Sequence, residues 1–375
     1  MKIQLQLATV LLATTVAAIA QNSGTKLYRS GGEWVQEVTG TLPAGKIVRV
    51  RSSAGAIRVH GWQQNNISYI VRQHVRAGSE SAARREFSHM KFSTVASGET
   101  VLLRADCEGN RGYIDFELQV PAHTSLLKLE TNGGAVSAQG IAGRVDASTG
   151  GGDIHLDKIG GVVSVASGGG TIDIGQVGSD ITVSTGGGNI HVGSAAGRVI
   201  ATSGGGNLNI GSARLMTLQT GGGQIKVLKC DGPIKAETAG GAIDLSEIEG
   251  PAQIESGGGS IRINAIRSGL HAETGSGPII ATLARGANFS DSRLETSVGD
   301  IVVYVPDGLG VTVRAAVEVA RGDGISSDFP GLKITRSNSI GPREAFAEGS
   351  INGGGPVLHV HTATGNIQIK RMPKE

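Results

Sequence analysis

The chain has 375 residues, of which 60 are glycine and only 10 are proline, and its formal net charge is +2. This much glycine without a Gly-X-Y period excludes collagen. A net charge near zero, with acids and bases interspersed, excludes the basic footprint of a nucleic-acid-binding protein and a polybasic membrane anchor.

Residues 1–20 have the pattern of a secretory signal peptide. Lys2 supplies a positive start, an apolar stretch follows, and Ala18-Ile19-Ala20 fits the small-x-small cleavage rule. The apolar stretch is too short for a transmembrane segment, and no second candidate follows it. The sequence therefore predicts an exported protein, located in the periplasm, on the cell surface or outside the cell. We expect residues 21–375 to form a single β-solenoid domain.

The region before the clearest repeats is irregular. Ser52–Val59 (SSAGAIRV) looks like one coil of a solenoid, with Ile57 and Val59 facing inward, and Glu80–Phe87 (ESAARREF) predicts a short helix. Cys107 also lies in this region. An exported protein could bridge it to Cys230, although Cys230 falls at a predicted core position where a small buried residue is the simpler interpretation.

An 18-residue repeat fills residues 131–288. Each unit opens on Thr or Ser, and most units continue with two or three glycines and an apolar–x–apolar pair. Such a fixed period is typical of a solenoid. Only one step between openings is a residue short, the one from Ser203 to Thr220. The openings are Thr131, Thr149, Ser167, Thr185, Ser203, Thr220, Thr238, Ser256 and Thr274.

Two short strands are predicted in each unit. When the opening residue is numbered 1, apolar side chains alternate with polar ones at positions 6 and 8, and again at positions 15 and 17. Stacked units bring each strand beside its copy, about 4.8 Å away, so that Ile154, Ile172 and Ile190 lie over one another in an aliphatic core. The sequence predicts an all-β fold, a single-stranded parallel β-helix with about 18 residues per coil. The usual hand of parallel crossovers makes it right-handed.

Degenerate coils follow the repeat. Thr296–Val303 (TSVGDIVV) continues the pattern after a four-residue expansion, and Thr362–Ile369 (TATGNIQI) closes it. Terminal coils are expected to be atypical, because they must protect exposed strand edges.

Several stretches outside the plain repeat also form a pattern. They are Ala56–Trp62 (AIRVHGW), Val305-Pro306-Asp307 leading to Asp328-Phe329-Pro330, and Asn352–Pro356 (NGGGP) running into Gly365–Lys370 (GNIQIK). With the Thr/Ser-Gly-Gly-Gly-x-Ile coils, they resemble the bacterial exported "putative adhesin" β-solenoid family, a domain of unknown function. The resemblance covers nearly the whole mature chain. It implies a parallel β-helix on the cell envelope and carries over no catalytic residues.

Position 18 of the later units forms a candidate cation site. It holds Glu237, Glu255, Glu273 and, after the expansion, Glu295. Carboxylates stacked about 4.8 Å apart repel and raise one another's pKa, and a calcium ion could relieve the repulsion. The alternative is a solvated acidic ridge, because Lys235 and His271 lie two residues before Glu237 and Glu273 on the same strand face and partly balance the charge.

Two histidine patterns are weaker metal candidates. His155, Asp173 and His191 occupy position 7 of three successive units, but the two histidines would lie about 9.6 Å apart, an awkward span for one zinc ion. His359 and His361 share one strand face near the C-terminus and could hold a metal weakly.

We expect a non-enzymatic protein of the cell envelope, an adhesin or surface scaffold, that binds a protein or a surface glycan without a cofactor. Its ends could also associate end to end through β-edge pairing. Two alternatives stay open: an envelope-stress or signalling accessory that binds a protein partner, and a polysaccharide-acting enzyme. Such an enzyme needs aromatic platforms for sugar rings, and no Phe, Tyr or Trp occurs between Glu117 and Asn288.

Overall fold

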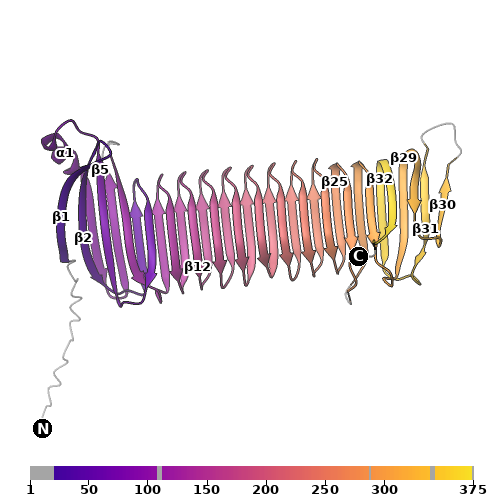
Figure 1. Ribbon diagram of the computed structural model, residues 1–375, viewed down its shortest axis with the longest axis horizontal. Helices are drawn as coiled ribbons and strands as arrows, with labels where there is room; N and C mark the ends of the chain where they lie inside the picture. The colour runs from indigo at the N-terminus through magenta and orange to yellow at the C-terminus, as the bar shows by residue number, and fades with distance from the viewer. Residues whose placement is uncertain (1–20, 108–111, 287–288, 338–342, 374–375) are drawn as a thin grey trace, which may run out of the picture.

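The computed structural model describes residues 21–107, 112–286, 289–337 and 343–373. The predicted signal peptide, residues 1–20, and the last two positions of the predicted repeat, 287–288, lie outside the described residues. The described chain contains 32 strands and one helix, which form a long straight rod (Figure 1). Within those ranges no helix is long and apolar enough to cross a membrane.

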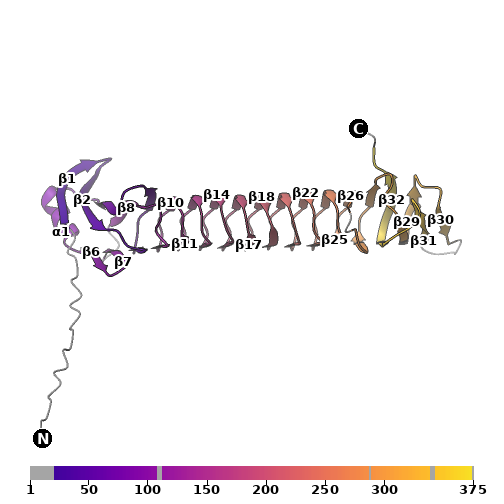
Figure 2. The same cartoon turned by 90° about the horizontal axis from the view of Figure 1, so that it is seen from below.

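Two walls of parallel strands run the length of the rod, and Figure 2 shows them edge-on. Wall A holds the first strand of each coil: β10 (Val136–Ile141), β12 (Ile154–Ile159), β14 (Ile172–Val177), β16 (Ile190–Ala195), β18 (Leu208–Ala213), β20 (Ile225–Cys230), β22 (Ile243–Ile248), β24 (Ile261–Ile266), β26 (Ile279–Leu283) and β28 (Ile301–Val305).

Wall B holds the second strand of each coil, together with the strand that precedes the first full coil. Its strands are β9 (Leu126–Thr131), β11 (Arg144–Thr149), β13 (Val163–Ser167), β15 (Ile181–Thr185), β17 (Arg198–Ser203), β19 (Leu215–Thr220), β21 (Ile234–Thr238), β23 (Ala252–Ser256), β25 (Leu270–Ser276) and β27 (Ser292–Val298).

The strand register superposes equivalent residues of successive coils, as the sequence predicts. Ile154 pairs with Ile172, and Ile172 pairs with Ile190. All three side chains are at most 1% exposed and belong to one continuous aliphatic cluster between the walls. Burying an isoleucine of this kind contributes about 2 kcal/mol, so the core is the main source of stability. The predicted all-β parallel solenoid is confirmed.

The short unit leaves this register intact. Ser203 still pairs with Thr220, because the missing residue is taken from the bend between β18 and β19. There a single residue, Arg214, separates the two strands, whereas two residues separate β16 from β17. The bends therefore absorb length changes that the strands would not tolerate.

Glycines at the corner of each coil have different roles. A Cβ on Gly188, at position 4, would lie 2.1 Å from the carbonyl oxygen of Gly170 in the coil before, so only glycine fits the close backbone approach. A Cβ on Gly187, at position 3, would meet nothing within 4 Å. The stacking of the corners, and not chain flexibility, explains the glycine at position 4.

A ladder of buried hydroxyl groups joins the corners. Thr185 Oγ1 donates a hydrogen bond to the carbonyl oxygen of Gly170 at 2.9 Å and accepts one from the amide of Gly188 at 3.2 Å. The Thr or Ser that opens each coil from Thr131 to Thr274 makes the same donation, and so do Thr296 and Thr362. The hydroxyl column therefore satisfies backbone groups that the tight corner would otherwise leave unpaired.

The N-terminal end does not follow chain order. β3 (Ile47–Ser52) lies between β7 (Thr100–Cys107) and β9, and β4 (Ile57–Trp62) lies between β8 (Gly112–Pro121) and β10. The predicted coil at residues 52–59 is thus present, with Ile57 and Val59 fully buried. The predicted helix is α1 (Glu80–Phe87). The remaining strands, all antiparallel to their neighbours, are β1 (Gln21–Ser30), β2 (Glu33–Pro43), β5 (Asn66–Val75) and β6 (Met90–Ser97).

The C-terminal end differs from the sequence expectation. β32 (Val357–Arg371), which contains the coil expected to close the stack, instead lies between the β27–β28 coil and β29 (Val311–Ser327). Beyond β29 come β31 (Ala345–Ile351) and then the five-residue edge strand β30 (Leu332–Arg336), both in antiparallel pairing. The last strand of the chain is held on both sides, which a terminal position would not provide.

Both cysteines are free thiols. Cys230 is buried in the core, at the predicted position, and Cys107 is partly buried at the end of β7. Burial raises the pKa of both thiols. Both groups therefore stay protonated and unreactive near neutral pH.

Candidate functional site

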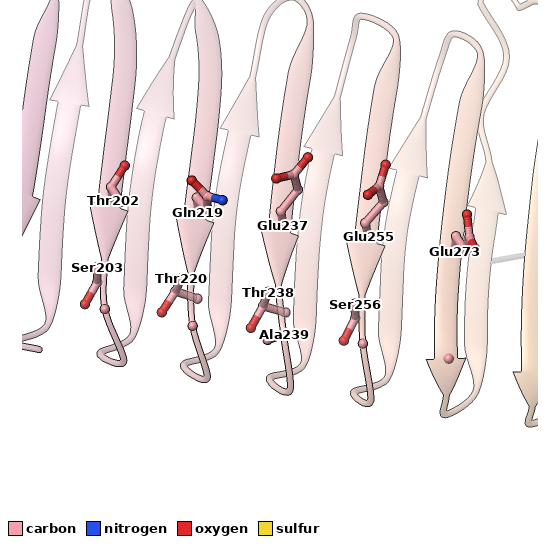
Figure 3. A pocket seen from close by; sticks show the side chains of 14 residues that line it. Thr202, Ser203, Gln219, Thr220, Glu237, Thr238, Ala239, Glu255, Ser256 and Glu273 are labelled. Carbon is pink, nitrogen blue, oxygen red and sulfur yellow. The ribbon is translucent and has the colours of Figure 1, made fainter.

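A shallow groove of about 710 Å³ runs along the outside of wall B. It crosses β17, β19, β21, β23 and β25 and is open to solvent along its length (Figure 3). Its lining consists of hydroxyl, amide and carboxylate side chains with glycine and alanine: Thr202, Ser203, Gly204, Gln219, Thr220, Gly221, Glu237, Thr238, Ala239, Glu255, Ser256, Gly257, Glu273 and Gly275.

The repeat itself produces the groove. Position 18 of each coil points outward from wall B, whereas position 1 is buried in the hydroxyl ladder and position 2 is a small residue at the corner. The side chains at position 18 thus form one side of the groove, and the small residues at position 2 form its floor. Figure 3 shows Glu237, Glu255 and Glu273 projecting from successive strands, above the row of hydroxyl side chains.

The structure brings the predicted glutamates into one column. Glu237 pairs in register with Glu255, Glu255 with Glu273, and Glu273 with Glu295. Glu295 lies on β27, one strand beyond the groove, and His361 of β32 continues the column. The sequence thus correctly placed these carboxylates on adjacent strands.

Glu237 and Glu255 both have a partner two residues earlier on their own strand. Lys235 Nζ lies 2.5 Å from Glu237 Oε1, and Gln253 Nε2 donates a hydrogen bond to Glu255 Oε1 at 2.8 Å. The pKa of Lys235 is raised, chiefly by its hydrogen bond to Glu237, with a smaller contribution from the charge of Glu255. The side-chain partner of Glu237 is therefore a fixed positive charge at neutral pH.

Glu273 and Glu295 repeat this arrangement with other partners. His271 Nε2 lies 3.8 Å from Glu273 Oε2, and Arg293 Nη2 lies 2.7 Å from Glu295 Oε1. The hydrogen bond to Glu295 raises the pKa of Arg293, and the charge of Glu273 adds to this effect. Each glutamate of the column therefore has a partner two residues earlier on its own strand, an arrangement that also fits the solvated acidic ridge given as the alternative to a calcium site.

No metal centre of three or more ligands is gathered within the described ranges. The four glutamates follow one another along the rod and do not converge on one point, so calcium binding at Glu237, Glu255, Glu273 and Glu295 stays a prediction. On wall A, His155 Nδ1 lies 3.2 Å from Asp173 Oδ2, an exposed side-chain hydrogen bond between neighbouring coils. The predicted row of His155, Asp173 and His191 is in register on the outer face.

Sequence reasoning missed two parts of this face. Thr202, at position 18, and Gln219, the last residue of the short unit, pair in register with the column before Glu237 and extend the groove, although neither carries a charge. At the C-terminal end, β29 and β31 bring Ala316 and Phe346 beside His361. No periodic signal could have found that contact, because it depends on the non-sequential order of the last strands.

Comparison with known proteins gave few results. No family model and no curated protein matches the chain. A putative cell adhesion protein from Clostridium sporogenes is 9% identical over 94% of this chain and 100% of its own, with a TM-score of 0.19. A putative adhesin from Bacteroides fragilis is 11% identical over 90% of this chain and 97% of its own, with a TM-score of 0.24. At these TM-scores neither likeness bears on the function of this chain.

Proposed function

We propose that the protein is an exported adhesin or surface scaffold of a bacterial cell envelope, which binds a protein or a surface glycan along wall B. The observation that carries this proposal is the open groove of about 710 Å³ over five adjacent strands. Its column of donors and acceptors repeats at the strand spacing, about 4.8 Å, and so offers equivalent contacts to a ligand that is itself extended and repetitive.

The form of the groove supports binding and not catalysis. It is open along its length, and its glutamates are paired with neighbours on the same strand. Enzyme active sites generally exclude water and hold their reactive groups in an enclosed geometry. A non-enzymatic role is therefore part of the proposal.

Export is supported by the signal-peptide pattern of residues 1–20. The free, protonated thiols of Cys107 and Cys230 are compatible with this location, because neither depends on a reducing compartment to stay unreactive.

The experiment has two parts. Protease treatment of intact cells that express the full chain tests location, and degradation of the protein without lysis is the result expected for a surface protein. Beads coated with the purified protein are then tested for retention of cells and of isolated envelopes. We expect retention, and we expect E237Q/E255Q/E273Q to reduce it.

A matched triple variant controls for the loss of charge. D173N/D244N/E247Q removes three carboxylates from wall A, which faces away from the groove. Retention unchanged in the wall B variant, or reduced equally in both variants, would show that the groove is not the binding surface. If beads coated with the wild-type protein retain neither cells nor isolated envelopes, adhesion itself is rejected.

A further inference from the structure

A second hollow, of about 400 Å³, lies at the C-terminal end of wall B. It sits on the outer face of β27, β32, β29 and β31, and Figure 1 shows the last three of these at the yellow end of the rod. The groove described above ends at β25, so this hollow is a separate site on the same face.

The hollow exists because a small residue lies in a row of large ones. Glu295 pairs in register with His361, His361 with Ala316, and Ala316 with Phe346. Ala316 therefore leaves a gap between the imidazole of His361 and the phenyl ring of Phe346, whose backbones are two strand spacings, about 9.6 Å, apart. Phe346 is 48% exposed, so its ring is available to a ligand.

The groups around the gap are charged but balanced. Arg314 Nε lies 3.4 Å from Glu348 Oε1, and His361 Nε2 lies 3.1 Å from Glu318 Oε1. Arg293 and Glu295 complete the lining, which sets two guanidinium groups against two carboxylates, those of Glu295 and Glu348. Because these charges balance and pair with one another, the lining favours neither an anionic nor a cationic ligand.

We propose that this hollow binds one ring of a neutral saccharide. The apolar face of a pyranose ring stacks on Phe346 above Ala316, and its hydroxyl groups, each both donor and acceptor, pair with the guanidinium of Arg314 and the carboxylate of Glu348. The inference rests on the proposed role in surface adhesion. It selects a neutral glycan, and not a protein, as the ligand at this end of the rod.

The test uses purified full-length protein on an array of soluble oligosaccharides: neutral glucans, mannans, xylans and N-acetylglucosamine oligomers, with oligogalacturonate as the acidic arm. We expect the wild type to bind at least one neutral class. Phe346→Ala removes the platform and Ala316→Leu fills the gap, so each variant weakens that binding by about tenfold or more. Both side chains point outward, and thermal unfolding of each variant checks that the fold is kept.

Two control variants make a comparable truncation to alanine and the same alanine-to-leucine enlargement elsewhere. Leu228→Ala truncates a side chain that is 50% exposed on wall A, and Ala166→Leu enlarges an exposed alanine at position 18 of wall B. Neither should alter saccharide binding. Equal affinity of wild type, F346A and A316L for the neutral glycan, or binding to oligogalacturonate alone, overturns the inference.

The proposed function is judged separately, by the bead assay. If the wild type retains cells but binds no saccharide, adhesion stands and the saccharide site is wrong. If it binds neither cells nor saccharides, both proposals fail. If it binds a neutral saccharide through Phe346 but retains no cells, the site stands and adhesion is wrong.

Discussion

The central coils of the rod and its two ends use the same strand pairing but connect the strands differently. From β11 to β26 each strand pairs with its counterparts in the coil before it and the coil after it in the chain. At the ends the chain doubles back, so that β3 and β4 are inserted near the N-terminus and β32 near the C-terminus. The centre is therefore modular, whereas each end is a single interlocked unit.

This difference reflects the problem of a free strand edge. A plain coil at either end would expose a row of unpaired backbone groups and invite further strands to add. At the C-terminal end the outermost strand is instead β30, which has five residues and carries Lys333 and Arg336. A short charged edge is a known way to discourage such addition. The end-to-end self-association that the sequence suggests is therefore disfavoured at this end of the rod.

Two deletions of similar length should have very different effects. Removing residues 185–202 takes out one complete coil and places Ser203 in register over Ser167. Because solenoid stability is a sum over neighbouring coils, we expect a folded, slightly less stable rod. Removing residues 357–375 takes β32 from between two partners, and β29, β30 and β31, which pair with the rest of the rod through β32, should lose their fold. Limited proteolysis with mass spectrometry distinguishes the two.

Unfolding of the rod by the central deletion would contradict a modular centre. Protection of β29, β30 and β31 from protease in the chain without β32 would contradict an interlocked end. A point variant, Ile367→Ala, sharpens the test, because Ile367 is fully buried and its loss should cost about 2–5 kcal/mol without removing the strand.

A glycine pair tests the corner stacking within one central coil. Gly188→Ala places a methyl group against the carbonyl of Gly170 and should destabilise the protein by about 3 kcal/mol. Gly187→Ala meets open space and has no left-handed backbone to lose, so it should be neutral or stabilise by about 0.5 kcal/mol. Chemical denaturation measures both. Equal effects would mean that the corners adjust freely.

A substitution in the hydroxyl ladder should have a smaller effect on the free energy of unfolding. Thr185→Val keeps the shape of the side chain but leaves the carbonyl of Gly170 and the amide of Gly188 without that partner. The expected cost is about 1–3 kcal/mol of unfolding free energy. Ser184→Ala, at the exposed neighbouring position, should change stability by less than about 0.5 kcal/mol. Indistinguishable values would show that the ladder is not stabilising.

The periodicity of the sequence made the structure of the central coils predictable, but it did not predict the strand order at the two ends. The alternation around Ile154 and Ile172 gives strand, register and core at once, because every coil repeats the same constraint. The same pattern identified the coil at Thr362–Ile369. It did not predict that this coil lies between β28 and β29. Which strand it joins depends on long-range pairing that leaves no mark in the local sequence.

The candidate sites divide in the same way. The column of Glu237, Glu255 and Glu273 followed from the repeat, and Lys235 could be placed beside it because residues two apart share a strand face. The groove depends on the contrast between long side chains at position 18 and small ones at positions 1 and 2, which a search for charged motifs overlooks. The gap at Ala316 needed the structure, since its neighbours come from four separate strands.

The smallest expected effect concerns calcium at the glutamate column. Lys235 and Arg293 compete with a cation for the oxygens of Glu237 and Glu295, so millimolar calcium should raise the melting temperature of the wild type only slightly. Removing both positive charges, in K235Q/R293Q, leaves the carboxylates to repel one another and should enlarge the calcium-dependent rise. Magnesium, which prefers a rigid octahedral shell, should do less. If calcium shifts the melting temperature of neither protein, these glutamates do not bind it, and their role is limited to pairing with the side chains two residues before them.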